Sequence, residues 1–413
     1  MRKANFILLV TVVMSVLVAL PLFGCAPGAH PEEKYVTFLS LSDLTGPGAG
    51  LVFPVVEAMN FGFEDINAKG GVDGVKLNVI TVDTRYDTAR TVSAYKRYRT
   101  EHKVLYAFIP LTPGVKALEP LMKADKVPSM TPADGEFQGR IGWVFLAALP
   151  YQDGFAASLD WMLKDWKAKG NPGVPAVGYL SCDSAYGREA LRGGKEYAEK
   201  IGVKLLNPEF FPTGSADHTV WLSRINDSGA NYCFIGGVDP TQSLILRDAA
   251  KLGITKKIQF VSDFWGLDEN VGIKVHPEAT EGAVVVSPFV RGDEGRKIPY
   301  VAETWNRHSK APISESKALF PGGVLLSRHV EQALKMALKD VGYDKMDGEA
   351  MYKAYQKLTG FDSGGVMGPG CAYSPTSRKS NEFVRFYRVQ SGKTVPITDW
   401  VKAPDAVSLY PNW

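Results

Sequence analysis

The sequence is poor in cysteine, with four among 413 residues. It contains no CxxC pair and no Cys/His spacing typical of zinc, so we expect no metal site. Apart from Cys25 near the N-terminus, the chain has Cys182, Cys233 and Cys371, which is an odd number. At most one disulfide fits. The sequence favours buried free thiols, with a Cys182–Cys233 bond as the alternative.

An excess of charge of one sign is also missing. Lysine and arginine total 47, against 44 aspartates and glutamates. No run of five like charges occurs after residue 24. Surfaces that bind nucleic acid are strongly basic, so we expect no nucleic-acid partner.

The motifs of common catalytic sites are absent. There is no GxSxG, no HExxH and no GxxxxGK[ST]. The segment TGPGAG has glycines two apart but lacks the GxGxxG spacing of dinucleotide sites. We therefore expect no enzyme activity and no cofactor. The catalytic alternative is a surface-anchored hydrolase that uses Asp43, Asp134 or Asp239.

A run without charge, residues 6–22, follows two basic residues near the N-terminus. The pattern is typical of a secretory signal, and a single membrane anchor of ~20 residues is the alternative. The run ends in LFGC, which resembles the lipobox of bacterial lipoproteins, where the cysteine becomes lipidated. We expect a signal peptide over 1–24, a lipid on Cys25 and a tether over 25–34. The alternative is a secreted or membrane-tethered protein in which Cys25 carries no lipid.

Strand and helix patterns alternate after this segment. Residues 36–41 (VTFLSL) are β-branched and apolar, which predicts a strand, and apolar residues then recur three and four apart up to Ile66, which predicts a helix. Gly70 suits the left-handed residue just past a helix end. Asp73-Gly74 predicts a tight turn before a buried strand over 77–82.

The same unit recurs along the chain. Further strands are expected over 105–109, 128–130, 143–146, 176–180, 203–206, 230–235, 258–262, 282–287 and 383–389. Further helices are expected over 88–101, 114–125, 152–168, 187–200, 218–228, 241–253, 322–340 and 348–358. Strands joined by crossover helices pair in parallel, so the pattern predicts an α/β fold of two doubly wound lobes. The late elements return to both lobes; one large sheet with decoration is the alternative.

Open α/β sheets bind ligands outside the carboxyl ends of their strands. Glycines, hydroxyls, carboxylates and aromatic side chains cluster at these ends, in residues 42–50, 111–114, 131–135, 181–187, 236–242 and 262–268. This mixture suits a small molecule that is partly polar and partly apolar.

The chemistry of these loops suggests roles for several residues. N–H groups at helix N-termini can hold a carboxylate, and Asp263 can pair an ammonium. Tyr186, Phe264 or Trp265 can cover an apolar body. The plainer alternatives are helix capping by the loop aspartates and ordinary packing of the aromatic rings.

Several motifs in order carry a family resemblance. They are LTGPGA (44–49), DINAKGGVDGVKLNVITVD (65–83), SMTPA (129–133), DSAYGREA (183–190), IGG (235–237) and AAKLGI (249–254). With them the chain resembles type I periplasmic binding proteins of the leucine/isoleucine/valine-binding group, the substrate-binding components of ABC importers. The resemblance covers nearly the whole chain after the signal, and INAKGG is its most specific piece.

The resemblance implies two Rossmann-like lobes joined by a hinge of three crossovers. The first lobe would comprise 35–149 and 284–365, the second 150–283 and 366–390, and a C-terminal tail 391–413.

The resemblance also implies a ligand site between the lobes. A ligand carboxylate would meet Thr112 and the loop of Ala133, Asp134 and Gly135. Tyr186, Val238 and Asp239 would contact the ligand from the second lobe. Asp263 would pair an α-ammonium, Leu51 would touch the ligand side chain, and Phe264 would suit a larger or aromatic ligand.

The sequence departs from the family pattern near the expected carboxylate site. PLTPGV stands where relatives that bind branched-chain amino acids have a serine-rich loop, and Asp134 stands where they have small or hydroxyl residues. Two like charges at close range would repel by about 4 kcal/mol at an effective dielectric near 20. Leucine is therefore not the expected cargo unless Asp134 turns away as a cap.

Together these features predict a lipid-anchored solute-binding protein outside the cytoplasm, in the periplasm or on the cell surface. It would capture an amino acid or related small organic acid and deliver it to an ABC permease. The alternatives are a ligand sensor for a regulatory partner, and a cargo that is an aromatic acid or amide.

Overall fold

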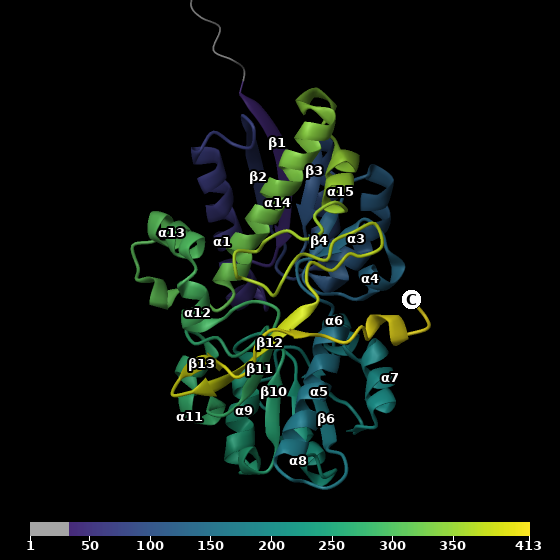
Figure 1. Cartoon of the computed structure of the whole chain (residues 1–413), viewed down its shortest axis with the longest axis vertical. Helices are drawn as coiled ribbons and strands as arrows, with labels where there is room; N and C mark the ends of the chain where they lie inside the picture. The colour runs from purple at the N-terminus through teal and green to yellow at the C-terminus, as the bar shows by residue number, and fades with distance from the viewer. Residues whose placement is uncertain (1–32) are drawn as a thin grey trace, which may run out of the picture. The chain divides into compact units, whose positions relative to one another are not determined.

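The computed structural model describes residues 33–413 (Figure 1). The predicted signal peptide, Cys25 and most of the predicted tether lie outside the described residues. The first lobe is built on a parallel five-stranded sheet of order β2-β1-β3-β4-β5. Its strands are β1 (Lys34–Ser42), β2 (Val75–Asp83), β3 (Val104–Phe108), β4 (Ser129–Thr131) and β5 (Val144–Leu146).

Helices lie on both faces of this sheet because successive residues of β1 face opposite sides. Phe38 stacks on Phe63 of α1 with ring centroids 6.0 Å apart, whereas Leu39 and Leu41 belong to the cluster that contains Leu118 of α3. The helices are α1 (Ala49–Ala68), α2 (Thr88–Glu101), α3 (Thr112–Asp125) and α4 (Glu136–Arg140), with α13 (Pro299–His308), α14 (Phe320–Val341) and α15 (Gly348–Tyr355) from later in the chain. Helix α14 packs along α1, and α15 packs against α14 and β3 (Figure 1).

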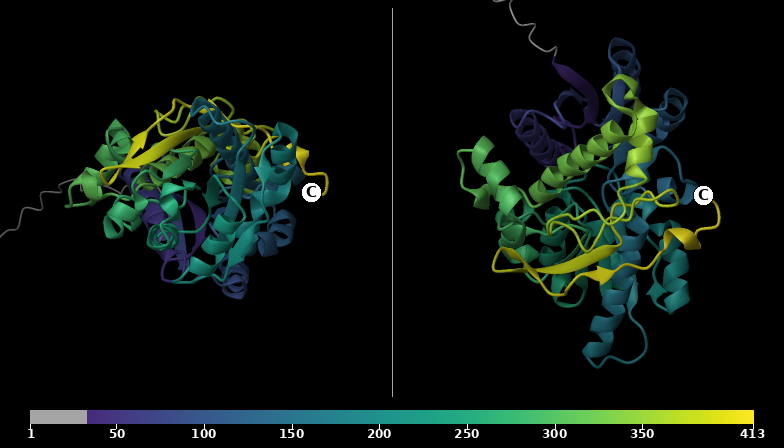
Figure 2. Two further views of the ribbon diagram at one scale, coloured as in Figure 1. Left: turned by 90° about the horizontal axis from the view of Figure 1, so that it is seen from below. Right: turned by 45° about the horizontal axis from the view of Figure 1, so that its top comes forward.

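The second lobe is built on a nine-stranded sheet whose main order is β13-β12-β11-β10-β9-β6-β7. Strands β6 to β11 pair in parallel, while β12 and its partners β11, β13 and β14 pair antiparallel. The strands are β6 (Ala176–Cys182), β7 (Lys204–Leu205), β8 (Glu209–Phe211), β9 (Tyr232–Ile235), β10 (Gln259–Ser262), β11 (Val284–Ser287), β12 (Phe383–Gln390), β13 (Lys393–Pro396) and β14 (Val401–Lys402). Figure 2 shows the late strands in yellow along the edge of this lobe.

The helices of the second lobe connect these strands. They are α5 (Tyr151–Ala168), α6 (Ala185–Glu189), α7 (Leu191–Ile201), α8 (Thr219–Asp227), α9 (Thr241–Lys251), α10 (Gly272–Val275) and α11 (Pro277–Thr280). Helix α12 (Gly292–Arg296) and four short 3₁₀ turns complete the described residues: Ile254–Lys256, Ile313–Glu315, Tyr343–Lys345 and Val407–Leu409.

Three passages of the chain join the lobes, and they lie side by side. The first leads from β5 to α5, the second from β11 toward α13, and the third from α15 to β12. Bridges pair Leu146 of the first passage with Lys379 of the third, and Phe289 of the second with Met367 of the third. The prediction of two Rossmann-like lobes with a three-crossover hinge is confirmed.

Part of the predicted lobe division needs correction. Strand β11, at the start of the segment 284–365, pairs with β10 and β12 and so belongs to the second sheet. The segment 391–413 is not a separate tail throughout, because β13 and β14 pair with β12. Both errors have one cause: the partners of a strand are set by packing, and no local sequence pattern reveals them. The remaining boundaries stay predictions.

The double-glycine motif forms the predicted helix stop and turn. Gly70 and Gly71 have φ of 97° and 80°, and Asp73 has φ of 49°. A Cβ on Gly71 would lie 2.2 Å from the carbonyl oxygen of Val75, so only glycine lets the chain fold back this closely. Val72 and Val75 then exchange two backbone hydrogen bonds of 2.8 and 2.9 Å.

The described residues include three of the four cysteines. Cys182, Cys233 and Cys371 are buried and free, so the favoured prediction holds and the Cys182–Cys233 bond is absent. Within residues 33–413 no helix is long and apolar enough to cross a membrane.

Candidate ligand site between the lobes

One cavity receives residues from both lobes, and its space, which is open to solvent, is about 410 Å³. The first lobe contributes Gly48, Leu51, Val52, Tyr86, Pro110, Thr112 and Pro132; the crossover and the second lobe contribute Tyr151, Tyr186, Val238 and Trp265. None of these side chains is charged. The cavity therefore suits a ligand with an apolar or aromatic body.

Strand ends bring these residues together. Leu51 lies in the first turn of α1 after β1, Tyr86 follows β2, and Thr112 opens α3 after β3. In the second lobe Tyr186 follows β6 and Trp265 follows β10. Parallel strands of one sheet end at the same edge, so residues far apart in sequence share one wall.

Hydrogen bonds fix the aromatic wall. Trp265 Nε1 donates to the Tyr151 hydroxyl at 2.7 Å, and the Tyr151 N–H donates to the carbonyl oxygen of Ala133 at 2.9 Å. The rings of Tyr151 and Tyr186 meet edge to face with centroids 5.2 Å apart. The wall is therefore set before a ligand arrives, which lowers the ordering cost of binding.

Helix α3 begins at the cavity. Thr112 is its first residue, Pro113 follows it, and the side chain of the preceding Leu111 makes no cap. The N–H groups of a first helical turn lack acceptors within the helix, and the helix dipole favours an anion there. This end of the cavity can hold a carboxylate.

Asp263 lies behind the aromatic wall in the second lobe. Its carboxylate accepts hydrogen bonds from the Tyr186 hydroxyl, from Gln242 Nε2 at 2.5 Å and from the Trp265 N–H at 3.0 Å. Burial raises the pKa of Asp263 to about 7, although the hydrogen bonds from Tyr186, Trp265 and Gln242 oppose the rise. Asp263 thus positions two wall residues, and its oxygens already have partners.

The sequence matches the model of one known protein family. The model of the family described as "Periplasmic binding protein" matches residues 36–394. The chain belongs to this family. Within residues 33–413 of this periplasmic binding protein, no group of His, Cys, Asp and Glu could hold a metal ion.

Curated relatives of this periplasmic binding protein are distant. Leu/Ile/Val-binding protein BraC3 of Rhizobium johnstonii is 21% identical over 90% of this chain and 95% of its own length. An Amino acid binding protein of Pseudomonas aeruginosa is 23% identical, and the match spans 48% of this chain and about half, 52%, of that relative.

Solved structures share the fold at low identity. A branched chain amino acid ABC transporter protein from Thermus thermophilus with bound valine has a TM-score of 0.80 at 19% identity, covering 91% of this chain and 98% of that one. A fatty acid ABC transporter substrate-binding protein from Thermomonospora curvata has a TM-score of 0.77 at 18% identity, covering 92% and 94%.

The structure places the predicted site residues at different depths. Leu51, Thr112, Tyr186 and Val238 line the cavity. Ala133, Asp134, Gly135, Asp239, Asp263 and Phe264 are not among its wall residues. Contact of any of them with a ligand stays a prediction.

Three of the residues that do not line the cavity are in contact with other parts of the protein. A Cβ on Gly135 would lie 2.3 Å from Gln152 Oε1, so this backbone packs on a side chain of α5. Asp239 is buried and accepts the N–H of Asp268 at 2.6 Å. Phe264 stacks on Tyr151 with centroids 5.9 Å apart. Each of these three residues therefore packs against or bonds with neighbouring protein groups.

Two aromatic residues of the wall, Tyr86 and Tyr151, were not predicted from the sequence. Tyr86 follows the carboxyl end of β2, a loop that deserved the same reading as the other strand ends. Tyr151 opens the crossover helix α5 and looks like an ordinary start of a helix. Trp265, by contrast, was predicted from its loop to cover an apolar body, and it lines the cavity.

A second opening of about 540 Å³ adjoins the cavity. It shares Gly48, Tyr86, Tyr186 and Val238 with the cavity and extends past Ser184 and Thr213. The two spaces therefore share one wall, with Ser184 and Thr213 on the far side of the second opening.

A polar cluster next to the cavity bridges the lobes. Lys116 Nζ of α3 lies 3.2 Å from Asp134 Oδ2, 2.9 Å from Glu136 Oε2 and 3.2 Å from Glu189 Oε2. Glu189 belongs to α6 of the second lobe and also accepts Gln152 Nε2 at 3.0 Å. We call Lys116, Asp134, Glu136 and Glu189 the bridging cluster. The bridging cluster links α3 of the first lobe to α6 of the second lobe, and none of its residues lines the cavity.

The buried carboxyl of Asp134 makes the bridging cluster sensitive to pH. Burial raises the pKa of Asp134 from 3.8 to about 8, the nearby Glu189 carboxyl raises it further, and Lys116 opposes the rise. Glu136, Arg140 and Arg192 are further charged groups of this region. A raised carboxyl pKa stabilises the folded state fully below pH 3.8 and loses that contribution as pH rises through about 8.

We expect Asp134→Asn to flatten the pH dependence of stability. The asparagine has no proton to lose, so the fall in the free energy of unfolding between about pH 4 and about pH 8 becomes shallower than in the unchanged protein. Urea unfolding across this range measures it. Asp399→Asn, at a fully exposed side chain, is the control and should follow the unchanged protein. If the free energy of unfolding changes equally with pH in Asp134→Asn and in the unchanged protein, Asp134 is not the group that causes the pH dependence.

Proposed function

We propose that this protein is the substrate-binding component of an ABC importer and that it captures a small organic acid with an aromatic or apolar body. The observation that carries the proposal is the uncharged cavity lined by residues of both lobes. Contacts from both lobes exist only when the lobes are closed, so a ligand shifts the equilibrium toward the closed state.

The walls favour an acid over an amino acid. The N-terminus of α3 offers N–H groups to a carboxylate beside Thr112. An ammonium needs an acceptor, and the carboxylate of Asp263 is held by Tyr186, Gln242 and Trp265 behind the wall. A free amino acid would therefore bury its ammonium without a charged partner, which costs binding energy.

The comparisons support transport as the role. Fold neighbours include proteins named for transport of branched-chain amino acids and of fatty acids, so the fold accommodates both polar and apolar cargo. We propose that the chain works outside the cytoplasmic membrane, delivers its cargo to a permease, and is held to the membrane by a lipid on Cys25. A ligand sensor would use the same lobes without a permease.

Thermal unfolding tests the proposal. The purified protein is unfolded and refolded to remove carried-over ligand, then titrated with 3-phenylpropionate, benzoate, phenylalanine, leucine and glucose. A ligand at 100 times its dissociation constant stabilises the native state by about 2.7 kcal/mol. We expect 3-phenylpropionate to raise the unfolding temperature more than phenylalanine, which differs only by the ammonium. A shift with leucine or glucose alone would overturn the proposed cargo class.

A further inference from the structure

The opening of about 540 Å³ beside the cavity has no part in the proposed function so far. Both lobes form it: Pro47, Gly48 and Tyr86 come from the first lobe, and its other wall residues come from the second. None of the wall residues is Asp, Glu, Lys, Arg or His. The opening is connected to solvent, so a small polar group can enter it, and an uncharged wall suits a neutral group.

The cavity leads into the opening along the first turn of α1. The Leu51 N–H donates to the carbonyl oxygen of Gly48 at 3.2 Å, so the two residues lie one turn apart. Leu51 lines the cavity alone, whereas Gly48 lines both spaces. Thr112, beside the expected carboxylate, lines only the cavity. A ligand with its carboxylate at Thr112 therefore turns its other end toward the opening.

Tyr86 lies at the boundary between the two spaces and is held there by its loop. Arg85 and Tyr86 have φ of 52° and 59°, a region that residues other than glycine seldom adopt. The Asp83 carboxylate supports this backbone, because it accepts the N–H groups of Leu44 at 3.0 Å and of Arg85 at 3.1 Å. A Cβ on Gly48 would lie 3.5 Å from Tyr86 Cδ2. The Tyr86 ring is therefore fixed against the start of α1.

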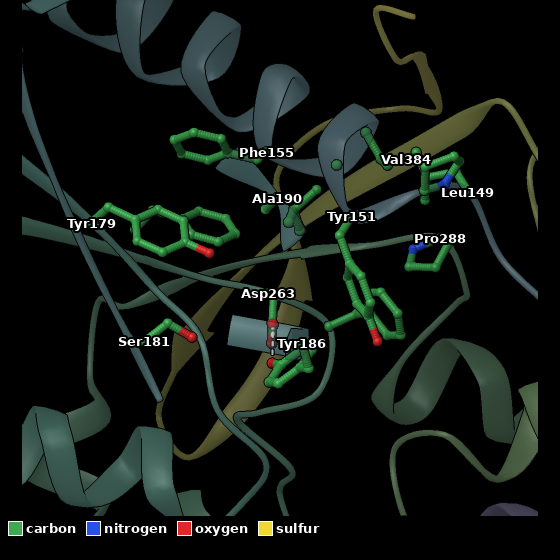
Figure 3. Close-up of a pocket in the computed structure, with 15 residues that line it drawn as sticks. Leu149, Tyr151, Phe155, Tyr179, Ser181, Tyr186, Ala190, Asp263, Pro288 and Val384 are labelled. Carbon is green, nitrogen blue, oxygen red and sulfur yellow. Dashed lines mark hydrogen bonds between the residues drawn. The ribbon is translucent and has the colours of Figure 1, made fainter. Parts of the chain in front are cut away.

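Two hydroxyls near the opening already have protein partners. Figure 3 shows the Tyr186 hydroxyl bonded to Asp263, and this hydroxyl also accepts the N–H of Gly237 at 3.0 Å. The Ser184 hydroxyl accepts the N–H of Gly187 at 3.1 Å. Neither of these hydroxyls is the first choice for a ligand.

Three other hydroxyls around the opening are available. In the part of the chain from residue 33 to 413, the hydroxyls of Tyr86, Thr213 and Thr241 make no hydrogen bond to protein groups. Thr213 is exposed, whereas Tyr86 and Thr241 are half-buried. Burial raises the pKa of Tyr86 to about 12, with smaller rises from Cys182 and Asp43. The Tyr86 hydroxyl therefore keeps its proton at neutral pH and can donate it to a ligand.

We propose that the opening receives a neutral hydrogen-bonding group of the cargo, such as a hydroxyl or an amide at the end remote from the carboxylate, and that Tyr86 selects this group. The inference rests on the proposed function and narrows its cargo. Tyr86 comes from the first lobe and Thr241 from the second. Both can bond with one group only when the lobes are closed, so the group favours the closed state.

Two acids of nearly equal size test the inference by calorimetric titration of the refolded protein: 3-(4-hydroxyphenyl)propionate and 3-(4-methylphenyl)propionate. They differ in a hydroxyl or a methyl group at the ring position opposite the propionate chain. We expect the hydroxyl acid to bind about fivefold more tightly, because the methyl group leaves the hydroxyls of Tyr86 and Thr241 without a partner. Equal affinities, or tighter binding of the methyl acid, would overturn the inference.

Two variants that keep the size of the side chain locate the effect. In Tyr86→Phe the ratio of the two affinities should fall from about five to about one, and in Thr241→Val to about two. Tyr98→Phe, on α2 and outside both spaces, is the matched control and should keep the ratio. The ratio compares two ligands on one protein, so a loss of stability or of lobe closure affects both alike.

A ratio that stays at about five in Tyr86→Phe contradicts the role of Tyr86. If Tyr86→Phe does not fold, an unchanged ratio in Thr241→Val overturns the inference instead.

The outcomes distinguish this inference from the proposed function. Equal binding of both acids removes the neutral group from the opening and leaves the acid-binding function intact. Absence of binding by both acids, together with a thermal shift by leucine or glucose, removes the proposed function and the inference with it.

Discussion

Lys116→Met is expected to lower the free energy of unfolding by about 3 kcal/mol at pH 8, because breaking a buried ion pair leaves charges without a partner. Lys116 is the cation among Asp134, Glu136 and Glu189, and the first and last of these carboxyls are buried. Without the lysine the two carboxylates repel each other, and protonation of Asp134, whose pKa burial already raises, relieves the repulsion. The loss should therefore shrink as the pH falls.

Urea unfolding of the unchanged protein and of the variant measures this effect. Lys123→Met, at an exposed lysine on the same helix, is the matched control and should stay within about 0.5 kcal/mol of the unchanged protein. If the two variants lose equal stability, the bridging cluster does not hold the lobes as described.

Trp265→Ala is expected to weaken the binding of 3-phenylpropionate about 30-fold, which corresponds to about 2 kcal/mol for a buried aromatic contact. The indole is a wall of the cavity and also donates to the Tyr151 hydroxyl. Its removal takes away apolar contact and frees the Tyr151 ring. Calorimetric titration gives the affinities.

Trp265→Phe separates the two contributions. It keeps an aromatic wall and loses the hydrogen bond to Tyr151, so we expect a loss of about fivefold. Trp166→Phe, a substitution outside the cavity, should bind as the unchanged protein does. A Trp265→Ala variant with unchanged affinity would show that the ligand lies elsewhere.

Local patterns located most of the longer alternating elements, although α13 was not predicted and the helix expected over 187–200 is divided into α6 and α7. The apolar spacing between Val52 and Ile66 located α1 because these residues are buried against the sheet. The double glycine located the end of the helix because the chain reverses there with positive φ. Both features depend on residues close in sequence, which is why the sequence reveals them.

The roles of the buried carboxylates could not be foreseen in the same way. The resemblance predicts Asp134 near a ligand carboxylate, and this stays a prediction. The structure shows in addition that Asp134 lies in the bridging cluster with Lys116 and Glu189, two residues that are 73 positions apart. Asp263 was expected at an ammonium, and its partners Tyr186 and Gln242 come from other loops. Such partners are chosen by the packing of distant segments, which no spacing encodes.

The antiparallel edge of the second sheet shows the same limit. Strand β12 was expected from its pattern, but β13 and β14 are short and their pairing with β12 depends on the turns between them. The prediction placed β11 in the first lobe, whereas its pairing with both β10 and β12 places it in the second sheet.

A crystal structure of the refolded protein with 3-phenylpropionate tests the central claim most directly. The account predicts the carboxylate at the N-terminus of α3 beside Thr112 and the phenyl ring against Leu51 and Trp265, with the lobes closed around both. Density for the acid at another place, such as the separate opening of about 740 Å³ between α1, α13 and α14, would contradict the account.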